Sequence, residues 1–224
     1  CHGIDHEPLN ITNAIAQSCN SYFSEVFHQI IHKKSAEEGL EMWEKYVRKF
    51  GFGHYLNNDL YTGVPGNVPN NNLYNQMYNN NWTSTYIISL AIGQGEILAT
   101  PIQLANYTAI IANKGYFFTP HIIKKICTEH TEKPFVKCDE WEQINANLTE
   151  KKIVPISVNY FDYIIEGMER VLNGKKGTAT QALLKNIAIC GKTGTVENNQ
   201  GEDHSVFIAF APKENPQVAI CVYI

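Results

Sequence analysis

The first part of the chain carries apolar side chains at helical spacing. A short helix is expected over 10–17, followed by a longer one in which apolar residues between 22 and 31 fall at i, i+1, i+4, i+5, i+8 and i+9. Ser35 opens a third helix because its spacing to the glutamate three residues later is that of a capping box, and Gly51 ends it. The chain therefore begins as a set of short amphipathic helices.

Further helices are expected in the middle of the chain. Thr100-Pro101 is an N-cap followed by a helix-starting proline, and that helix runs to 113–115. A long amphipathic helix is expected over 157–173 and a shorter one over 178–185. The Asn-rich stretch 53–81 lacks periodicity and is expected to be a loop, either a surface excursion, which we favour, or part of a substrate groove.

The last part of the chain has the pattern of an antiparallel sheet. Three apolar segments of strand length follow one another at 187–195, 205–211 and 217–224, with connections short enough for antiparallel neighbours. Extended structure with a hairpin-like arm is also expected over 116–138. Helices first and a sheet last indicate an α+β fold.

Composition narrows the functional classes. Of the 224 residues 44% are hydrophobic, which is enough for one large core or two small ones. With 18 Lys+Arg against 22 Asp+Glu the net charge is −4, which argues against a dedicated nucleic-acid-binding protein. The six cysteines include no C-x-x-C pair, although Cys127 and Cys138 flank a polar turn and are able to bridge in an oxidising compartment.

Three short segments carry the residue types of acyl-transfer chemistry. Ser18-Cys19-Asn20 lies in a turn between helices, and Gly191-Lys192-Thr193-Gly194-Thr195 ends a predicted strand. Gly93-Gln94-Gly95 is interpreted as a tight structural turn, because it lacks the strand–G-x-G-x-x-G–helix setting of a phosphate loop. S-x-N and K-T-G are weak signals singly, but their order and settings match the set shared by serine β-lactamases and penicillin-binding proteins.

On these segments the whole chain resembles the later part of a class B penicillin-binding protein of the cell-elongation type. Gly167–Val171, Gly177–Ala179 and Phe207–Pro212 extend the resemblance beyond the motifs. It implies a serine β-lactamase/D,D-transpeptidase-like fold, a helical subdomain followed by antiparallel strands. We expect residues 1–224 to form the C-terminal part of one such domain, helical to about residue 175 and helix plus sheet after it.

The resemblance assigns catalytic roles to three residues. Ser18 would relay a proton towards the leaving group, and Asn20 would hydrogen-bond the acyl-amide backbone of the substrate. Lys192 would supply positive charge beside Ser18 and help to attract the substrate carboxylate. The nucleophilic serine of the family belongs to an S-x-x-K helix, which is absent here and expected upstream of Cys1, so the chain by itself should not turn over.

The resemblance also assigns a substrate-binding strand. The hydroxyls of Thr193 and Thr195 would bind the substrate carboxylate, and Gly194 would leave room for the substrate against the strand. The backbone N–H of Thr195 would form half of the oxyanion hole, with the N–H of the nucleophile as the other half.

No cofactor is expected. Cys1, His2, Asp5 and His6 cluster at the start of the chain, where some elongation-type relatives carry zinc, but a ragged terminus is the favoured interpretation and no metal is predicted. The thiol of Cys19 is expected to point into the helical core.

The resemblance implies a complete function for the parent protein. It would be anchored in the inner membrane with this part in the periplasm, cross-link peptidoglycan stem peptides, be acylated by β-lactam antibiotics, and work with a membrane glycosyltransferase of the elongation machinery. The alternatives are a penicillin-sensing receptor domain and a non-catalytic structural relative. A class D β-lactamase is disfavoured by the long inserted segments and the Gly-Gln-Gly helix.

Overall fold

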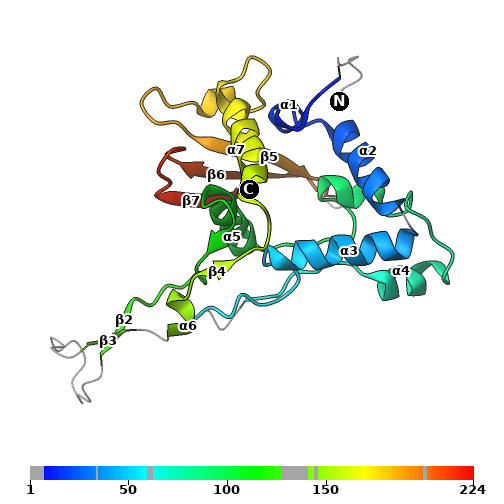
Figure 1. The fold of residues 1–224 in the computed structure, drawn as a ribbon, viewed down its shortest axis with the longest axis horizontal. Coiled ribbons are helices and arrows are strands. Elements are labelled where there is room, and N and C mark those ends of the chain that lie inside the picture. Colours follow the sequence, from blue (N-terminus) through cyan, green and yellow to red (C-terminus); the bar gives the residue numbers. More distant parts are fainter. Residues whose placement is uncertain (1–7, 34, 60–62, 128–140, 144–145, 199–200) are drawn as a thin grey trace.

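A computed structural model describes residues 8–33, 35–59, 63–127, 141–143, 146–198 and 201–224 (Figure 1). Its helices are α1 (Ile11–Ala16), α2 (Asn20–Ile31), α3 (Ala36–Lys49), α4 (Asn71–Tyr78), α5 (Pro101–Ala112), α6 (Ala146–Thr149) and α7 (Val158–Asn173), with 3-10 turns η1 (Ile88–Ile92) and η2 (Thr180–Ala182). Its strands are β1 (Tyr116–Phe117), β2 (Lys125–Cys127), β3 (Trp141–Gln143), β4 (Lys152–Ile153), β5 (Cys190–Val196), β6 (His204–Ala211) and β7 (Val218–Tyr223).

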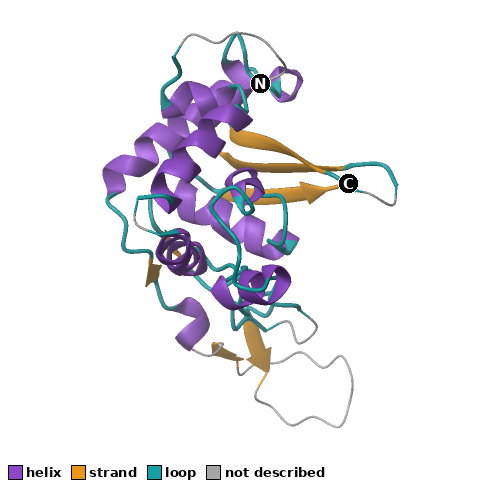
Figure 2. Ribbon diagram, turned by 90° about the vertical axis from the view of Figure 1, so that its right-hand side faces the viewer, coloured by secondary structure: helices purple, strands orange, loops and turns teal. Residues whose placement is uncertain are grey.

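The three long strands form one antiparallel sheet in the order β5-β6-β7. This confirms the strands expected near the end of the chain and the α+β class. Helix α7 packs on β5 and helix α5 packs on β7, so the sheet is held against helices from earlier in the sequence. Figure 2 shows the strands running side by side with helices packed against them. β5 lies at one edge of this sheet, with β6 as its neighbour.

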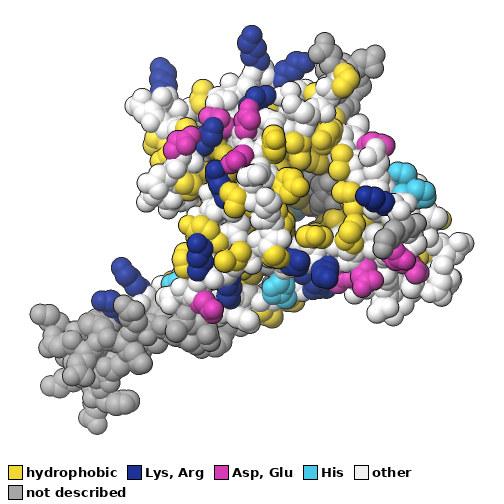
Figure 3. Space-filling view, viewed as in Figure 1, with side chains coloured by type: hydrophobic (Ala, Val, Ile, Leu, Met, Phe, Trp, Pro, Cys, Tyr) yellow, Lys and Arg dark blue, Asp and Glu magenta, His cyan; other side chains and the backbone are white. Residues whose placement is uncertain are grey.

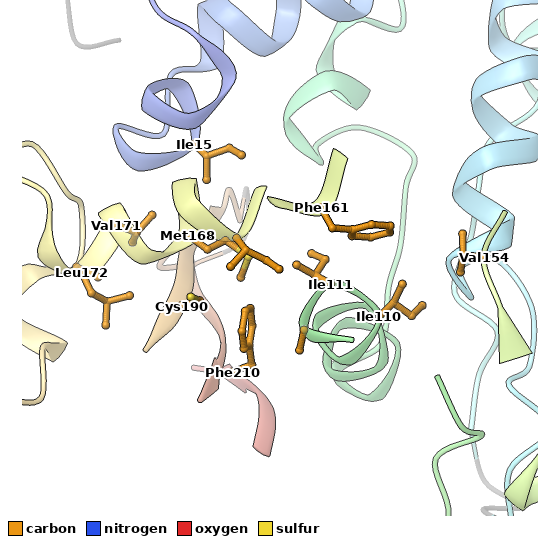
Figure 4. Close-up of a cluster of buried hydrophobic side chains, with 13 residues drawn as sticks. Ile15, Ile110, Ile111, Val154, Phe161, Met168, Val171, Leu172, Cys190 and Phe210 are labelled. Carbon is orange, nitrogen blue, oxygen red and sulfur yellow. The ribbon is translucent and has the colours of Figure 1, made fainter. Parts of the chain in front are cut away.

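The main core lies between α7, α5 and the sheet. It is built from buried apolar side chains that include Phe161 and Met168 of α7, Cys190 of β5 and Phe210 of β6. Figure 4 shows Ile15 of α1 on one side of α7 and the two strand residues on the other. Helix α7 is therefore the middle layer that connects α1 with β5.

Helix α1 lies very close to α7. A Cβ built on Gly167 of α7 would lie 2.8 Å from the Cβ of Ile15. Two hydrogen bonds also join these helices, because Arg170 Nη1 donates to Asn13 Oδ1 at 2.8 Å and Thr12 Oγ1 donates to the carbonyl of Tyr163 at 3.3 Å. These contacts fix where α1 ends relative to the sheet.

A second core forms the helical lobe. Phe27 and Ile31 of α2, Leu40 of α3 and Tyr74 of α4 pack together with aromatic and aliphatic residues up to Leu90. Helix α3 begins at the predicted cap, where Ser35 Oγ accepts from the N–H of Glu38 at 3.1 Å. The amphipathic pattern of the first part of the chain was therefore interpreted correctly.

The expectation of a loop throughout 53–81 was wrong, because α4 lies within it. Asn70 is the N-cap and its side chain accepts from the N–H of Leu73 at 3.1 Å, while Asn79 ends the helix with φ 51°. Tyr74 is fully buried and its hydroxyl donates to Glu96 at 2.6 Å. Asparagines favour both helix caps, so the residues that suggested a loop are those that bound the helix.

The helix expected over 178–185 was also wrong, because only the short turn η2 forms there. The side chains from 181 to 188 are exposed, so the segment has no apolar face to bury and a helix gains little from packing. Gly177 lies against the end of α7, where an added Cβ would be 2.4 Å from the carbonyl oxygen of Val171.

An arm extends from the body at the lower left of Figure 1. Strand β1 pairs with β4, and β2 pairs with β3, so the arm returns at 141–143. The carboxylate of Asp59 accepts from the N–H groups of Ile122 at 2.9 Å and Ile123 at 2.7 Å, which fastens the base of the arm. The proposed Cys127–Cys138 bridge falls outside the side chains that the structure describes.

Candidate active site

Ser18 lies in the turn that joins α1 to α2. Its backbone has φ 50°, a left-handed conformation that few residues other than glycine adopt. Its N–H donates to the carbonyl of Ile15 at 3.1 Å, and the N–H of Cys19 donates to the carbonyl of Ala14 at 2.9 Å. The turn is therefore closed by its own backbone and holds the serine in a fixed place.

Lys192 approaches this turn from strand β5. Its Nζ donates to Ser18 Oγ at 2.8 Å and to the carbonyl of Thr193 at 2.5 Å. The two side chains come from positions 174 residues apart, so the contact depends on the packing of α1 on α7 and of α7 on β5. Gly191 permits close packing beneath the lysine, since a Cβ there would lie 2.7 Å from the Phe207 ring.

Burial lowers the pKa of Lys192 from 10.5 to about 8, because the charged ammonium loses water. The neutral amine is thereby accessible close to physiological pH, while the cation still predominates at pH 7. An amine of this kind is able to hold or pass a proton at Ser18 Oγ.

Raising the pH is expected to stabilise the fold through Lys192. Between pH 8 and 10.5 the unfolded state binds a proton that the folded state has released, so the free energy of unfolding rises with pH, by up to about 3 kcal/mol. Urea unfolding of the wild type and of Lys192→Met at pH 8 and pH 10 measures this. The rise should be larger in the wild type; an equal rise in both proteins would contradict the assignment.

Two side chains that were not predicted to belong to the site hold the same strand. Thr178 Oγ1 lies 2.9 Å from Thr193 Oγ1, and Gln94 Nε2 donates to the carbonyl of Thr195 at 3.0 Å. Both residues lie in segments that support the family resemblance, but neither was predicted to belong to the site. Nothing in the local pattern indicates that they reach β5, because both contacts are made through tertiary packing.

Asn20 and Cys19 complete the turn. Asn20 is the first residue of α2 and is exposed. Among the described residues no hydrogen bond joins it to Ser18 or to Lys192. Cys19 is only 4% exposed and is disulfide-bonded, whereas Cys190 and Cys221 are free.

Gly194 is exposed on β5. A Cβ built there would approach Val206 at 3.7 Å, an ordinary contact, so the protein's own packing does not require glycine at this position. Thr195 and Gly194 are both exposed at the end of β5. This part of the strand is therefore accessible to a bound molecule.

An apolar hollow of about 680 Å³ lies beside the end of β5, between the helical lobe and the sheet. Its lining includes Phe50, Leu104, Tyr107 and Thr195. A neighbouring hollow of about 580 Å³ shares Phe50 and Tyr107 and is lined further by Ile164. Figure 3 shows hydrophobic side chains gathered around a hollow in the middle of one face. Unusually large apolar surfaces of this kind mark contact sites for other polypeptide.

The described ranges contain no group of three or more His, Cys, Asp or Glu side chains placed to hold a metal ion. The cluster of Cys1, His2, Asp5 and His6 falls outside those ranges. Within the same part of the chain no helix is long and apolar enough to cross a membrane.

The sequence has relatives of known family. Residues 1–224 match the family described as penicillin binding protein transpeptidase domain. The chain is 33% identical to the peptidoglycan D,D-transpeptidase MrdA of Acinetobacter baumannii, over 99% of this chain and 32% of that protein. It is 26% identical to the MrdA of Escherichia coli K12, over 98% of this chain and 34% of that protein. The chain thus spans about a third of the length of these curated relatives.

Solved structures share the fold. Pseudomonas aeruginosa PBP2 in complex with WCK 5153 matches with a TM-score of 0.77 and 28% identity, over 96% of this chain and 44% of that one. PBP2 from Helicobacter pylori matches with a TM-score of 0.76 and 29% identity, over 97% of this chain and 36% of that one. These matches confirm the transpeptidase-like fold that the sequence motifs implied.

Proposed function

The chain belongs to the penicillin-binding protein transpeptidase domain family, and on this premise we propose that it forms the later part of a D,D-transpeptidase that cross-links peptidoglycan stem peptides. The observation that carries the proposal is the hydrogen bond between Lys192 Nζ and Ser18 Oγ, beside the exposed end of β5. It joins the two motifs that the sequence shares with this family. Thr193 and Thr195, whose hydroxyls would bind the substrate carboxylate, lie on the same strand as Lys192.

The proposed reaction has two steps. A serine hydroxyl attacks the carbonyl of the penultimate D-Ala, the amide bond to the terminal D-Ala breaks, and the proton of the serine reaches the departing amine. An amino group of a second stem peptide then takes the acyl group, and the serine recovers a proton. In this scheme Ser18 passes the proton to the leaving amine, and Lys192 holds that proton path in place.

Strand β5 would bind the donor peptide. The hydroxyls of Thr193 and Thr195 suit the terminal carboxylate, and Thr178 would orient the first of them through their 2.9 Å contact. Asn20 is exposed close to Ser18 and would bond the acyl-amide backbone of the substrate. Gly194 is exposed and has no side chain, which would let substrate lie along the strand.

The nucleophile is proposed to come from an S-x-x-K segment that precedes Cys1 in the parent protein. The apolar hollows lined by Phe50 and Tyr107 would receive that segment, since the larger one lies beside the end of β5 and both are mainly hydrophobic. Thr195 would then meet the nucleophile across the hollow and share the oxyanion with its N–H. Residues 1–224 alone would bind no acyl group.

Location and partners follow the same proposal. The parent protein would act outside the cytoplasm at the inner membrane, where stem peptides are cross-linked, together with a membrane glycosyltransferase of the elongation machinery. A structural relative with 30% identity is described as a complex between PBP2 and MreC from Helicobacter pylori, so proteins of this type do assemble with partners. β-Lactam antibiotics would acylate the site as substrate mimics.

Intact-mass spectrometry after incubation with penicillin tests the function. We expect an adduct on a chain extended upstream to include S-x-x-K, lost when that serine becomes alanine, and no adduct on residues 1–224. An adduct on the short chain would place the nucleophile within it, with Ser18 as the first residue to examine. No adduct on either chain would support a non-catalytic structural relative instead.

A further inference from the structure

The Gly93-Gln94-Gly95 turn meets strand β5 from the helical lobe. Gln94 Nε2 donates to the backbone carbonyl of Thr195 at 3.0 Å, although 101 residues separate the two positions. From the sequence this turn was predicted to have only a structural role before helix α5. Its side chain instead contacts the residue whose N–H is the proposed oxyanion donor.

The register of the sheet decides where the N–H of Thr195 points. Thr195 pairs with Ser205 across β5 and β6. Ser205 exchanges both of its backbone hydrogen bonds with Ile224, at 2.9 and 3.0 Å, on the other side of β6. The Thr195–Ser205 pair is therefore of the non-hydrogen-bonded kind, and Thr195 directs both its N–H and its C=O to the free edge of β5.

The Gln94 side chain projects from a turn that a backbone hydrogen bond closes. Gly93 and Gly95 have φ 75° and 82°, and the N–H of Gln94 donates to the carbonyl of Ser89 at 3.1 Å. The positive φ of Gly95 favours glycine at this position. This turn presents the Gln94 side chain to the end of β5.

The backbone of β5 is less restrained around Thr195. Gly194 immediately precedes Thr195, and glycine leaves the backbone more conformational freedom than any other residue. β5 also lies at the edge of the sheet, so on one side no strand in the described ranges restrains it. A hydrogen bond to the Thr195 carbonyl limits the rotation of that residue, and so limits the direction of its N–H.

We infer that Gln94 is a positioning residue, which holds Thr195 so that its N–H points at the developing oxyanion. The inference rests on the proposed transpeptidase function. Because an oxyanion exists only after attack on the carbonyl, loss of this contact should slow acylation and leave the initial binding of the β-lactam unchanged.

The test uses the protein extended upstream through S-x-x-K. Gln94→Glu keeps the size of the side chain but loses the donor, and Gln94→Ala removes both. Gln29→Ala is the control, since Gln29 is exposed on α2 and donates to Glu25 of the same helix. Stopped-flow acylation by a chromogenic cephalosporin separates the acylation rate constant from the dissociation constant of the first complex. We expect both Gln94 variants to lose about 10- to 100-fold in the rate constant, less than the roughly 100- to 1000-fold cost of deleting an oxyanion donor.

Infrared spectroscopy of the acyl-enzyme provides a second measurement. A weaker oxyanion hole polarises the ester carbonyl less, so its stretching band should move to higher wavenumber in the Gln94 variants only. Wild-type rates and an unmoved band would overturn the inference, as would a loss that appears only in thermal stability and in the dissociation constant. Failure of the wild type to react at all would instead overturn the proposed function.

Discussion

Replacing Lys192 with alanine is expected to slow acylation by a β-lactam about 1000-fold in the protein extended upstream, within the range typical of positioned acid–base groups. The lysine Nζ is 2.8 Å from Ser18 Oγ, and its pKa of about 8 lets it both carry and release a proton there. Without it the serine hydroxyl has lost its charged partner. The rate constant is measured with fluorescent penicillin under single-turnover conditions.

Two further variants make this result specific. Lys45→Ala removes an exposed lysine from α3 and should acylate at the wild-type rate. Ser18→Ala should lose activity to a similar degree, and the double variant with Lys192→Ala should be little worse than either single variant, because the two groups act as one unit. Additive losses, or an active Lys192→Ala protein, would show that the observed hydrogen bond has no part in the reaction.

Replacing Gln103 with leucine is expected to lower the free energy of unfolding by about 4 kcal/mol or more, since each buried polar group left without a partner costs about 1–3 kcal/mol. Gln103 is 2% exposed. Its Nε2 lies 3.1 Å from the carbonyl oxygen of Gly51, 3.2 Å from that of His54 and 2.9 Å from that of Pro65. Its Oε1 accepts from the N–H of Thr100 at 2.9 Å. One side chain therefore organises the long loop after α3.

Urea unfolding followed by circular dichroism measures the effect. The matched control is Gln76→Leu on the exposed side of α4, which should change stability by less than about 0.5 kcal/mol. Gln103→Glu retains an acceptor for Thr100 but lacks the donor for the carbonyls, and should be destabilised as well. A Gln103→Leu protein as stable as the control would mean that water replaces the amide at these carbonyls.

The fold was predictable where one local signal dominated. The cap at Ser35 and the stop at Gly51 bound α3 because they act on backbone groups a few residues away. Helix α4 was missed because its stability depends on Tyr74 entering a core built by α2 and α3, which no local window contains. The segment after Gly177 was overpredicted for the converse reason, since its residues have a helical pattern but no surface to bury it against.

The site was predictable only in part. Ser18 and Lys192 were identified by their resemblance to a known set of motifs, and the structure places them in contact. Gln94 and Thr178 were not selected, because hydrogen bonds to a distant strand leave no periodic or compositional trace in the sequence. Spacing along the chain carries little information about contacts that tertiary packing creates.

The packing of α1 on α7 and of α7 on β5 sets the distance between Ser18 and Lys192. Ser18 follows the end of α1, and Lys192 lies on β5. Gly167 lets Ile15 pack directly against the α7 backbone, and so sets the distance between α1 and α7. A larger residue at Gly167 would push α1 away from α7 and so lengthen the distance between Ser18 and Lys192. A substitution at position 167 would therefore disturb the contact between Ser18 and Lys192 from a position buried beneath both side chains.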